Sequence, residues 1–279
     1  MKIISSPKEM KEFSAAAKAE GKKIALVPTM GALHDGHISL IDRARSLADV
    51  VVVSVFVNPT QFGPNEDYDK YPRQLEADAQ KCREHSADVV FAPSPSDIYA
   101  PDASTFVSEE QISQNLCGLS RPKHFRGVTT VVTILFNIVK PDFGVFGEKD
   151  AQQVSIIERM VRDLFMDVQI VRAPIVREES GLALSSRNKY MTPAERDGAT
   201  RIRKSLLAGK ALVDDGCTNI DRIKALVINT VTDAKTRVVY VEVVDAKTSL
   251  PVSELKIGQC RISMAVWYGQ TRLIDNIII

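Results

Sequence analysis

The sequence predicts an α/β protein in which a doubly wound parallel sheet is followed by a smaller α+β domain. The first observation is that short, apolar, β-branched runs alternate with helical periodicities over about the first 175 residues. The second is a change of pattern after Arg187, where helices come first and strands follow. A chain of 279 residues is long enough to hold one large domain or two modest ones.

The first elements show the alternation clearly. Residues 24–27 (I-A-L-V) predict a short buried strand, which Pro28 is expected to end. Apolar residues recur at helical spacing over 36–47 and predict a helix with one buried face. The run V-V-V-V-S-V-F-V at 50–57 is apolar on both faces, as a central parallel strand should be.

The same alternation continues to the end of the first domain. The expected elements, in order, are a helix at 74–85, a strand at 88–93, a helix at 128–139, a strand at 143–146, a helix at 150–164 and a strand within 168–176. Strands joined by helices form right-handed β-α-β units, so we expect a Rossmann-like domain over residues 1–175. Ligands of such sheets bind beyond the carboxyl ends of the strands.

Residues 176–279 predict the smaller C-terminal α+β domain. Thr192 suits a helix N-cap, and Pro193 suits the first helical position. The expected elements are helices at 193–213 and 219–234 and strands at 238–244, 261–267 and 272–276.

The composition is ordinary for a soluble globular protein, with 44% hydrophobic and 25% charged residues. A net charge of +1 gives no long-range attraction to nucleic acid or to an anionic membrane. The four cysteines form no C-x-x-C motif and are expected to be reduced thiols. The first residues lack the apolar core of a signal peptide, and the run at 50–57 is too short to cross a bilayer. These features predict a cytoplasmic protein.

Two of the four histidines lie three residues apart in P-T-M-G-A-L-H-D-G-H, residues 28–37. We expect His34 in the loop after the first strand and His37 in the first turn of the next helix. A helix N-terminus attracts phosphate through its free N–H groups and its dipole, and two imidazoles would add donors. The residues alone leave two alternatives open: the histidines cap or pack the loop, or they bind zinc, although His85 and His124 lack recognisable ligand spacing.

Two further segments carry phosphate-binding groups. G-E-K-D at 147–150 follows a predicted strand and opens a helix, where Asp150 suits an N-cap and Lys149 is placed to reach a phosphate. L-S-S-R-N at 184–188 offers two hydroxyls and a guanidinium. Either segment alone is typical of a solvated turn, but together with the histidine loop they predict a nucleoside triphosphate site.

The histidine loop resembles the H-x-G-H signature of the nucleotidyltransferase superfamily, which includes class I aminoacyl-tRNA synthetases. Further motifs occur in the order found in pantothenate synthetases (pantoate–β-alanine ligases): N-P-T-Q-F at 58–62, Y-P-R at 71–73, S-R-P-K-H-F-R-G at 120–127, F-G-E-K-D-A-Q-Q at 146–153 and G-L-A-L-S-S-R-N at 181–188. The similarity extends through R-L-I-D-N at 272–276. The sequence is therefore identified as a member of this family.

The resemblance implies an ATP-dependent condensation of (R)-pantoate with β-alanine to pantothenate, a precursor of coenzyme A. It implies a pantoyl-adenylate intermediate and release of AMP and pyrophosphate. ATP is then a substrate and Mg²⁺ an accompanying ion, with no metal-ligand set in the chain itself. Small molecules are the implied partners, without nucleic acid or membrane. The family usually forms a homodimer, and residues 176–279 are implied to act as a lid.

The resemblance also assigns roles to residues. His37 is implied as the proton donor, His34 as a contact to phosphate or ribose, and Lys149 as the group that neutralises the α-phosphate. Gln61 and Gln153 are implied to bind pantoate, and Gln61 also lies near β-alanine. Amides suit this task because they pair with hydroxyl and carboxylate groups without adding charge.

Three segments are implied to bind ATP. Residues 30–37 line the site, residues 184–187 hold the triphosphate, and Val176 offers backbone groups to adenine. The implied set is Met30, Gly31, Ala32, Leu33, His34, Asp35, Gly36, His37, Gly147, Glu148, Lys149, Asp150, Val176, Leu184, Ser185, Ser186 and Arg187.

Two other function classes share part of this pattern. A nucleotidyltransferase that moves AMP onto a phosphate would have the H-x-G-H loop but would not need N-P-x-Q-F or the Gln152–Gln153 pair. A non-catalytic nucleotide-binding module could keep the fold without needing both histidines, Lys149 and Arg187.

Beside Gln61, the polar stretch at 63–67 is expected to be mobile and to close over bound ligand.

Overall fold

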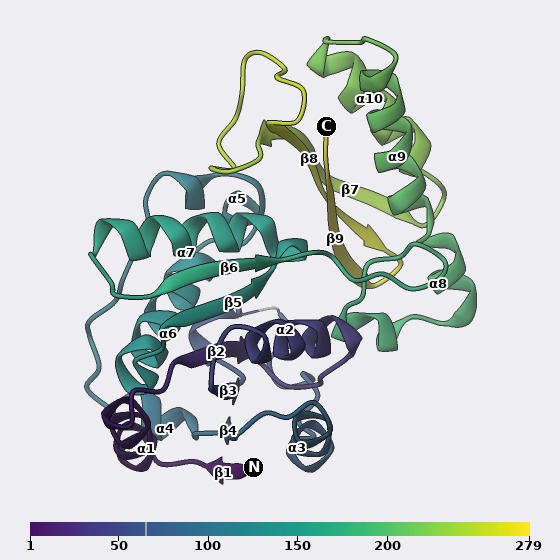
Figure 1. The fold of residues 1–279 in the computed structure, drawn as a ribbon. Helices are drawn as coiled ribbons and strands as arrows, with labels where there is room; N and C mark the ends of the chain where they lie inside the picture. Colours follow the sequence, from purple (N-terminus) through teal and green to yellow (C-terminus); the bar gives the residue numbers. More distant parts are fainter. Residues whose placement is uncertain (65) are drawn as a thin grey trace. The chain divides into compact units, whose positions relative to one another are not determined.

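The computed structural model describes residues 1–64 and 66–279, and their contacts divide the chain into two compact units (Figure 1). The first unit contains Met1–Glu109, Arg121–Glu148 and Ile156–Pro174, and the second contains Glu110–Ser120, Lys149–Ser155 and Ile175–Ile279. The last of these segments begins at Ile175, whereas the sequence predicts a domain boundary between residues 175 and 176. The sequence prediction puts the two short segments of the second unit in the first domain instead.

The first unit is built on a six-stranded parallel sheet in the order β1-β4-β3-β2-β5-β6. The strands are β1 (Lys2–Ile4), β2 (Ile24–Thr29), β3 (Val50–Val55), β4 (Val89–Phe91), β5 (Phe143–Gly147) and β6 (Gln169–Ala173). The chain runs outward from β2 in one direction through β3 and β4, and in the other through β5 and β6. The predicted doubly wound parallel sheet is therefore confirmed.

Helices cover both faces of this sheet. The helices of this unit are α1 (Pro7–Ala19), α2 (Asp35–Arg45), α3 (Leu75–Glu84), α4 (Pro95–Ile98), α6 (His124–Val139) and part of α7 (Ala151–Asp163). Helices α2 and α3 share a core with alternate strand residues such as Ala25, Val27 and Val51. Because successive strand residues point to opposite faces, the intervening residues face the side on which α1 and α6 pack.

The sequence prediction missed β1 and α1. Strand β1 has only three residues, too few to show a periodicity. Helix α1 buries only Met10, Ser14 and Ala17, so its apolar stripe is weak. Its start was nevertheless detectable, since Ser6 caps the backbone N–H of Glu9. Helix α6 also begins earlier than expected, at His124 rather than residue 128.

Pro28 does not end β2, which continues to Thr29. The carbonyl oxygen of Thr29 accepts from the N–H of Phe56 on the β3 side, so the backbone of Pro28 faces β5. The pairing of β2 with β5 includes only Ala25 and Leu26. The missing N–H of Pro28 therefore removes no hydrogen bond from the sheet.

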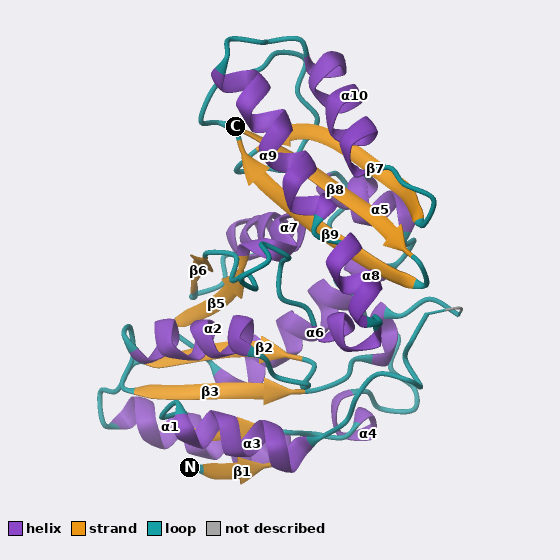
Figure 2. Ribbon diagram, turned by 90° about the vertical axis from the view of Figure 1, so that its right-hand side faces the viewer, coloured by secondary structure: helices purple, strands orange, loops and turns teal. Residues whose placement is uncertain are grey.

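The second unit carries a three-stranded antiparallel sheet of β7 (Thr236–Asp245), β8 (Cys260–Tyr268) and β9 (Thr271–Ile278) (Figure 2). Its other elements are α5 (Leu116–Ser120), α8 (Pro193–Gly198), α9 (Arg201–Asp214) and α10 (Ile220–Val231), with short 3-10 turns at Ile112–Gln114 and Ser186–Tyr190. Ile202, Val227 and Ile262 are among the residues of its core. This confirms the predicted smaller α+β architecture.

Two details of the second unit concern predicted helix ends. Thr192 caps α8 in a reciprocal arrangement with Glu195, as expected from its sequence. The prediction of a single helix at 193–213 is wrong, because α8 ends at Gly198 and α9 begins at Arg201.

Among the described residues, no helix is both long enough and apolar enough to cross a membrane.

Candidate active site

The histidine loop lies at the topological switch point of the parallel sheet. Strand β2 ends at Thr29 and lies between β3 and β5; the chain leaves β2 toward β3 on one side, whereas it leaves the neighbouring β5 toward β6 on the other. Ligands of open α/β sheets bind beyond the carboxyl ends of the strands at this point. The carboxyl end of β5 adds Gly147 and Glu148, whose carboxylate lies 3.7 Å from the guanidinium of Arg172. The first unit thus brings residues 30–37 to the edge where a nucleotide is expected.

A buried carboxylate on α3 shapes the histidine loop. Asp78 is fully buried and accepts hydrogen bonds from the backbone N–H groups of Ala32 and Leu33, at 2.9 and 2.8 Å. Lys81, one turn later, donates to the carbonyl oxygen of Leu33 at 2.7 Å. Gly31 has φ +81°, and a Cβ there would lie 2.9 Å from Asp78 Oδ2, so both the backbone and the space require glycine.

The two histidines cap the N-terminus of α2. His34 is the N-cap residue, and its Nδ1 accepts from the N–H of Gly36 at 3.2 Å. Nδ1 of His37 accepts from the N–H of His34 at 3.3 Å, and the ring centroids lie 4.1 Å apart. The capping alternative is therefore correct as a structural role. It does not compete with a chemical role, because an accepting Nδ1 leaves the hydrogen of a neutral imidazole on Nε2.

Gln61 lies in the 3-10 turn Pro59–Gln61 that follows β3. Its Nε2 contacts the sulfur of Met30 at 3.0 Å, so the predicted pantoate residue and the predicted ATP segment meet within the first unit. Helix α6 packs closely on this turn, since a Cβ at Gly127 would lie 2.4 Å from the carbonyl oxygen of Thr60 and 2.7 Å from Cα of Gln61.

Glu66, in the stretch expected to be mobile, forms an ion pair with Arg121 in the turn before α6. Arg121 donates from Nε to Glu66 Oε1 at 2.7 Å, and its Nη2 pairs with Oε2. Burial raises the pKa of the Glu66 carboxyl, but the hydrogen bonds and charge of Arg121 outweigh burial and hold that pKa below its usual value. Nδ1 of His124 lies 2.9 Å from the carbonyl oxygen of Gln61. Asn65, which belongs to the expected mobile stretch, is outside the described residues.

The second unit holds the other predicted ATP-binding residues. The carbonyl oxygen of Val176 accepts from the N–H of Leu184 at 3.0 Å, which places the predicted adenine contact beside the L-S-S-R-N segment. Ser185 caps the following 3-10 turn by accepting from the N–H of Arg187. Asp150 ends the 3-10 turn Glu148–Asp150, which runs directly into α7.

The R-L-I-D-N motif supports two of these segments. Asp275 is buried and forms two hydrogen bonds with Arg177, at 2.7 and 2.9 Å. Nδ2 of Asn276 donates to the carbonyl oxygen of Lys149 at 3.2 Å. The neighbouring residues Asp275 and Asn276 of β9 therefore hold the side chain of Arg177, which follows Val176, and the backbone of the predicted α-phosphate lysine.

The two glutamines of the Gln152–Gln153 pair have different surroundings. Gln152 is buried, and its side-chain amide bonds to the carbonyl oxygens of Ile112 and Asn115 and to the N–H of Cys117. Gln153 is half-buried and has no side-chain hydrogen bond to another described residue. The structure thus explains Gln152 as a support within the second unit and leaves the amide of Gln153 available to a ligand.

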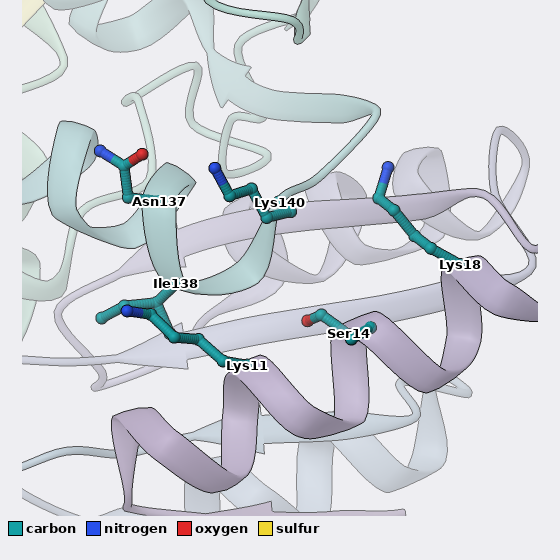
Figure 3. Close-up of a pocket in the computed structure, with 7 residues that line it drawn as sticks. Lys11, Ser14, Lys18, Asn137, Ile138 and Lys140 are labelled. Atoms are coloured by element: carbon teal, nitrogen blue, oxygen red, sulfur yellow. The ribbon is translucent and has the colours of Figure 1, made fainter.

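A cavity of about 540 Å³ lies elsewhere in the first unit, between α1 and the last turn of α6 (Figure 3). Lys11, Ser14 and Lys140 are among its lining residues. Both helices end just before strands β2 and β5 begin, so this cavity lies at the amino edge of the sheet and not at the histidine loop.

Among the described residues, no group of three histidine, cysteine or acidic side chains is placed to hold a metal ion.

Comparison with known proteins decides the family. The family model for pantoate–β-alanine ligase matches residues 2–278. The chain belongs to this family. Pantothenate synthetase from Thermotoga neapolitana is 51% identical over 280 residues, with 100% of both chains covered. That from Clostridium acetobutylicum is 52% identical over 277 residues, covering 99% of this chain and 98% of the relative.

Solved structures of the family match the fold. Pantothenate synthetase from Thermus thermophilus has a TM-score of 0.94 at 41% identity, covering 100% of this chain and 99% of that chain. Pantoate–β-alanine ligase from Francisella tularensis, complexed with β-γ ATP and β-alanine, has a TM-score of 0.83 at 38% identity. The coverages are 100% of this chain and 97% of that one.

The structure adds supporting residues that the family motifs did not identify. Asp78 shapes the histidine loop, Asn58 holds the Gln61 amide, and the Arg177–Asp275 pair holds the segment around Val176. Asn58 and Asp275 do lie inside quoted motifs, so their positions were visible but their tasks were not. Asp78 lies on a helix with no motif, and its full burial has no sequence signal.

Proposed function

We propose that this protein condenses (R)-pantoate with β-alanine to form pantothenate, using ATP and releasing AMP and pyrophosphate. The observation that carries the proposal is the family match over residues 2–278, with the H-x-G-H loop at the switch point of the parallel sheet. The crystal structure of the Francisella tularensis relative is complexed with β-γ ATP and β-alanine.

In the first half-reaction, a carboxylate oxygen of pantoate attacks the α-phosphorus of ATP. The bond to the bridging oxygen breaks, pyrophosphate leaves, and pantoyl adenylate forms. Negative charge grows on the phosphate oxygens, so this step needs preorganised donors more than a side-chain nucleophile. We assign His37 and His34 to this task through Nε2, and Lys149 to the α-phosphate.

The capping arrangement bears on what His37 can donate. As a neutral ring, it offers a hydrogen bond from Nε2 while Nδ1 accepts from the N–H of His34. To transfer a proton, it would first have to be an imidazolium, and its protonated Nδ1 could no longer accept that bond. The geometry therefore supports hydrogen-bond donation by His37 in preference to proton transfer.

In the second half-reaction, the amine of β-alanine attacks the acyl carbon of pantoyl adenylate. The amide bond forms, the amine loses a proton, and AMP leaves. We assign Gln61 and Gln153 to pantoate, and Gln61 also to β-alanine. Ser185, Ser186 and Arg187 are proposed to hold the triphosphate, with Val176 offering backbone groups to adenine.

Mg²⁺ is proposed to enter as part of the ATP complex. This ion is usually held by substrate phosphates, water and one or two carboxylates, so a dedicated protein cage is not needed. We further propose that the enzyme works as a homodimer in the cytoplasm and that residues 176–279 act as a lid. The resemblance to the family is what supports the proposed homodimer, location and lid.

The test is ATP–pyrophosphate exchange on the purified chain, with pantoate present and then absent. The proposal requires exchange only with pantoate, and formation of pantothenate and AMP in equal amounts once β-alanine is added. Exchange that does not depend on pantoate, or transfer of AMP onto a phosphate acceptor, would identify a different nucleotidyltransferase. Binding of ATP with no exchange under any condition would indicate a non-catalytic module.

A further inference from the structure

The amide of Asn58 is held in one orientation by backbone groups of fixed polarity. Asn58 is 1% exposed. The carbonyl oxygen of Gly127 lies 3.1 Å away and can only accept, so the Asn58 atom facing it is Nδ2. The N–H of Thr60 lies 3.3 Å away and can only donate, so the Asn58 atom facing it is Oδ1.

Two hydroxyl groups reinforce this orientation. Tyr99 donates to Asn58 Oδ1 at 2.8 Å, and Oγ1 of Thr60 lies 2.9 Å from the same atom. Burial raises the pKa of the Tyr99 hydroxyl, against a smaller lowering by its hydrogen bond to Thr60, so Tyr99 remains a donor at neutral pH. The tyrosine ring packs near Phe56, with centroids 6.4 Å apart. Tyr99 therefore brings one hydroxyl from the loop after α4 to the turn after β3.

The orientation of Asn58 determines that of Gln61. The second hydrogen of Asn58 Nδ2 points to Gln61 at 3.1 Å, so the atom that receives it is Oε1. Nε2 of Gln61 then lies on the other side, 3.0 Å from the sulfur of Met30. A thioether is a weak acceptor, so these N–H groups remain available to a stronger one. Gln61 thus offers donors, and it selects ligand oxygens that accept.

We propose that Tyr99 is a positioning residue for pantoate, acting through Asn58 to keep the N–H groups of Gln61 directed at the hydroxyl or carboxylate oxygens of the substrate. This inference rests on the proposed function and on the assignment of Gln61 to pantoate. Tyr99 itself need not contact the substrate. Its effect is specific to the substrate that Gln61 recognises.

The first test compares Tyr99→Phe with the wild type. This variant keeps the ring and removes only the hydroxyl, so we expect the KM for pantoate to rise about three- to tenfold, the usual effect of one lost hydrogen bond. The KM for ATP should stay within about twofold. The matched control is Tyr268→Phe, which removes a hydroxyl bonded to Asp233 at 3.0 Å in the second unit. That variant should leave both KM values unchanged.

A double-mutant cycle separates positioning from a general structural role. If Tyr99 acts through Gln61, Tyr99→Phe should change pantoate KM by less than about twofold in a Gln61→Ala background. Thr60→Val removes the second hydroxyl at similar side-chain volume and should reproduce the pantoate-specific effect. It also provides the test if Tyr99→Phe does not fold.

Two results would overturn the inference. One is an equal rise in the KM for ATP and pantoate, and the other is an undiminished effect of Tyr99→Phe in the Gln61→Ala background. Failure of the proposed function is distinguishable, because the wild-type chain would then form no pantothenate at all.

Discussion

At the scale of single residues, the two histidines that cap α2 are the same side chains that are proposed to act on the phosphates. Nδ1 of each ring accepts a backbone N–H, and Nε2 carries the hydrogen of the neutral ring. We predict that His37→Ala loses about 10²–10³ in the rate of pantoyl-adenylate formation, the usual effect of removing one transition-state donor. Coupling of preformed pantoyl adenylate to β-alanine should lose much less.

Single-turnover measurements of the two steps check this prediction. His85→Ala is the control, since His85 pairs with Asp42 at 2.9 Å outside the histidine loop and should have normal rates. Equal slowing of both steps by His37→Ala would show that the histidine has another task. Loss of the folded state would show that the cap dominates.

A second residue-scale prediction concerns Asp78, whose carboxylate holds two loop N–H groups. In Asp78→Asn, the new NH₂ group must face one of those donors, so we expect a loss of about 1–3 kcal/mol in unfolding free energy. The KM for ATP should rise because the loop at 31–33 shifts. Glu76→Gln, an exposed change on the same helix, should alter neither quantity. Denaturant unfolding and steady-state kinetics measure both, and normal ATP kinetics in Asp78→Asn would exclude the positioning role.

At the scale of elements, α6 and the turn at Pro59–Gln61 approach so closely that only glycine fits at residue 127. We predict that Gly127→Ala pushes the turn away, lowers stability by about 1–3 kcal/mol and raises the KM for pantoate about tenfold or more. Gly209→Ala is a matched control in α9, where a Cβ would meet Val227 Cγ2 at 2.6 Å. It should lower stability but leave pantoate kinetics unchanged. Equal kinetics for Gly127→Ala and wild type would show that the turn does not position the substrate.

The Glu66–Arg121 pair gives an element-scale prediction about pH. The pKa of Glu66 is lowered in the folded chain, so the pair adds stability above the unfolded pKa of about 4.3. That contribution is lost as pH falls through the lower folded pKa. We predict that Glu66→Gln is less stable than wild type by about 1–2 kcal/mol at pH 7, and that the difference shrinks below pH 4. Thermal melts at several pH values measure it, and a constant difference across the range would contradict the assignment.

The sequence predicted the elements whose pattern is local and repeated. The apolar run at 50–57 predicts a buried parallel strand, and Thr192 followed by Pro193 predicts the start of a helix; the structure confirms both. Other features depend on contacts distant in sequence. Pro28 continues its strand because β5 is not paired there, and Asp78 is buried because the loop at 31–33 needs its carboxylate. For the site, motifs located the residues that are proposed to bind ligands, while the tasks of Asn58 and Asp275 required coordinates.

At the scale of the whole molecule, the chain enters the second unit three times. The short segment Glu110–Ser120 bonds into it through Cys117, whose sulfur lies 3.1 Å from the hydroxyl of Tyr240. The segment Lys149–Ser155 bonds into it through Ser155, whose hydroxyl donates to the carbonyl oxygen of Lys247 at 2.8 Å. The N–H of Cys117 also donates to Oε1 of Gln152, at 3.0 Å, which joins the two short segments to each other.

These contacts lead to a prediction about fragments. Residues 176–279 begin at the boundary that the sequence suggested, but this fragment lacks both short segments and loses the contacts that they make with Tyr240 and Lys247. We predict that this fragment unfolds without a cooperative transition or melts at least about 10 °C below the second unit in the intact chain. A loss of about 2 kcal/mol in the free energy of unfolding lowers the melting temperature of a domain of roughly 100 residues by that much.

Circular dichroism measures the melting of the fragment, and hydrogen exchange measures the protection of the same residues in the intact chain. In the intact chain, amides at 116–120 and 151–155 should be protected to the same extent as those of β7, as one cooperative group. A fragment that melts cooperatively at the intact-chain temperature would show instead that the C-terminal residues fold alone and that the short segments merely lie on their surface.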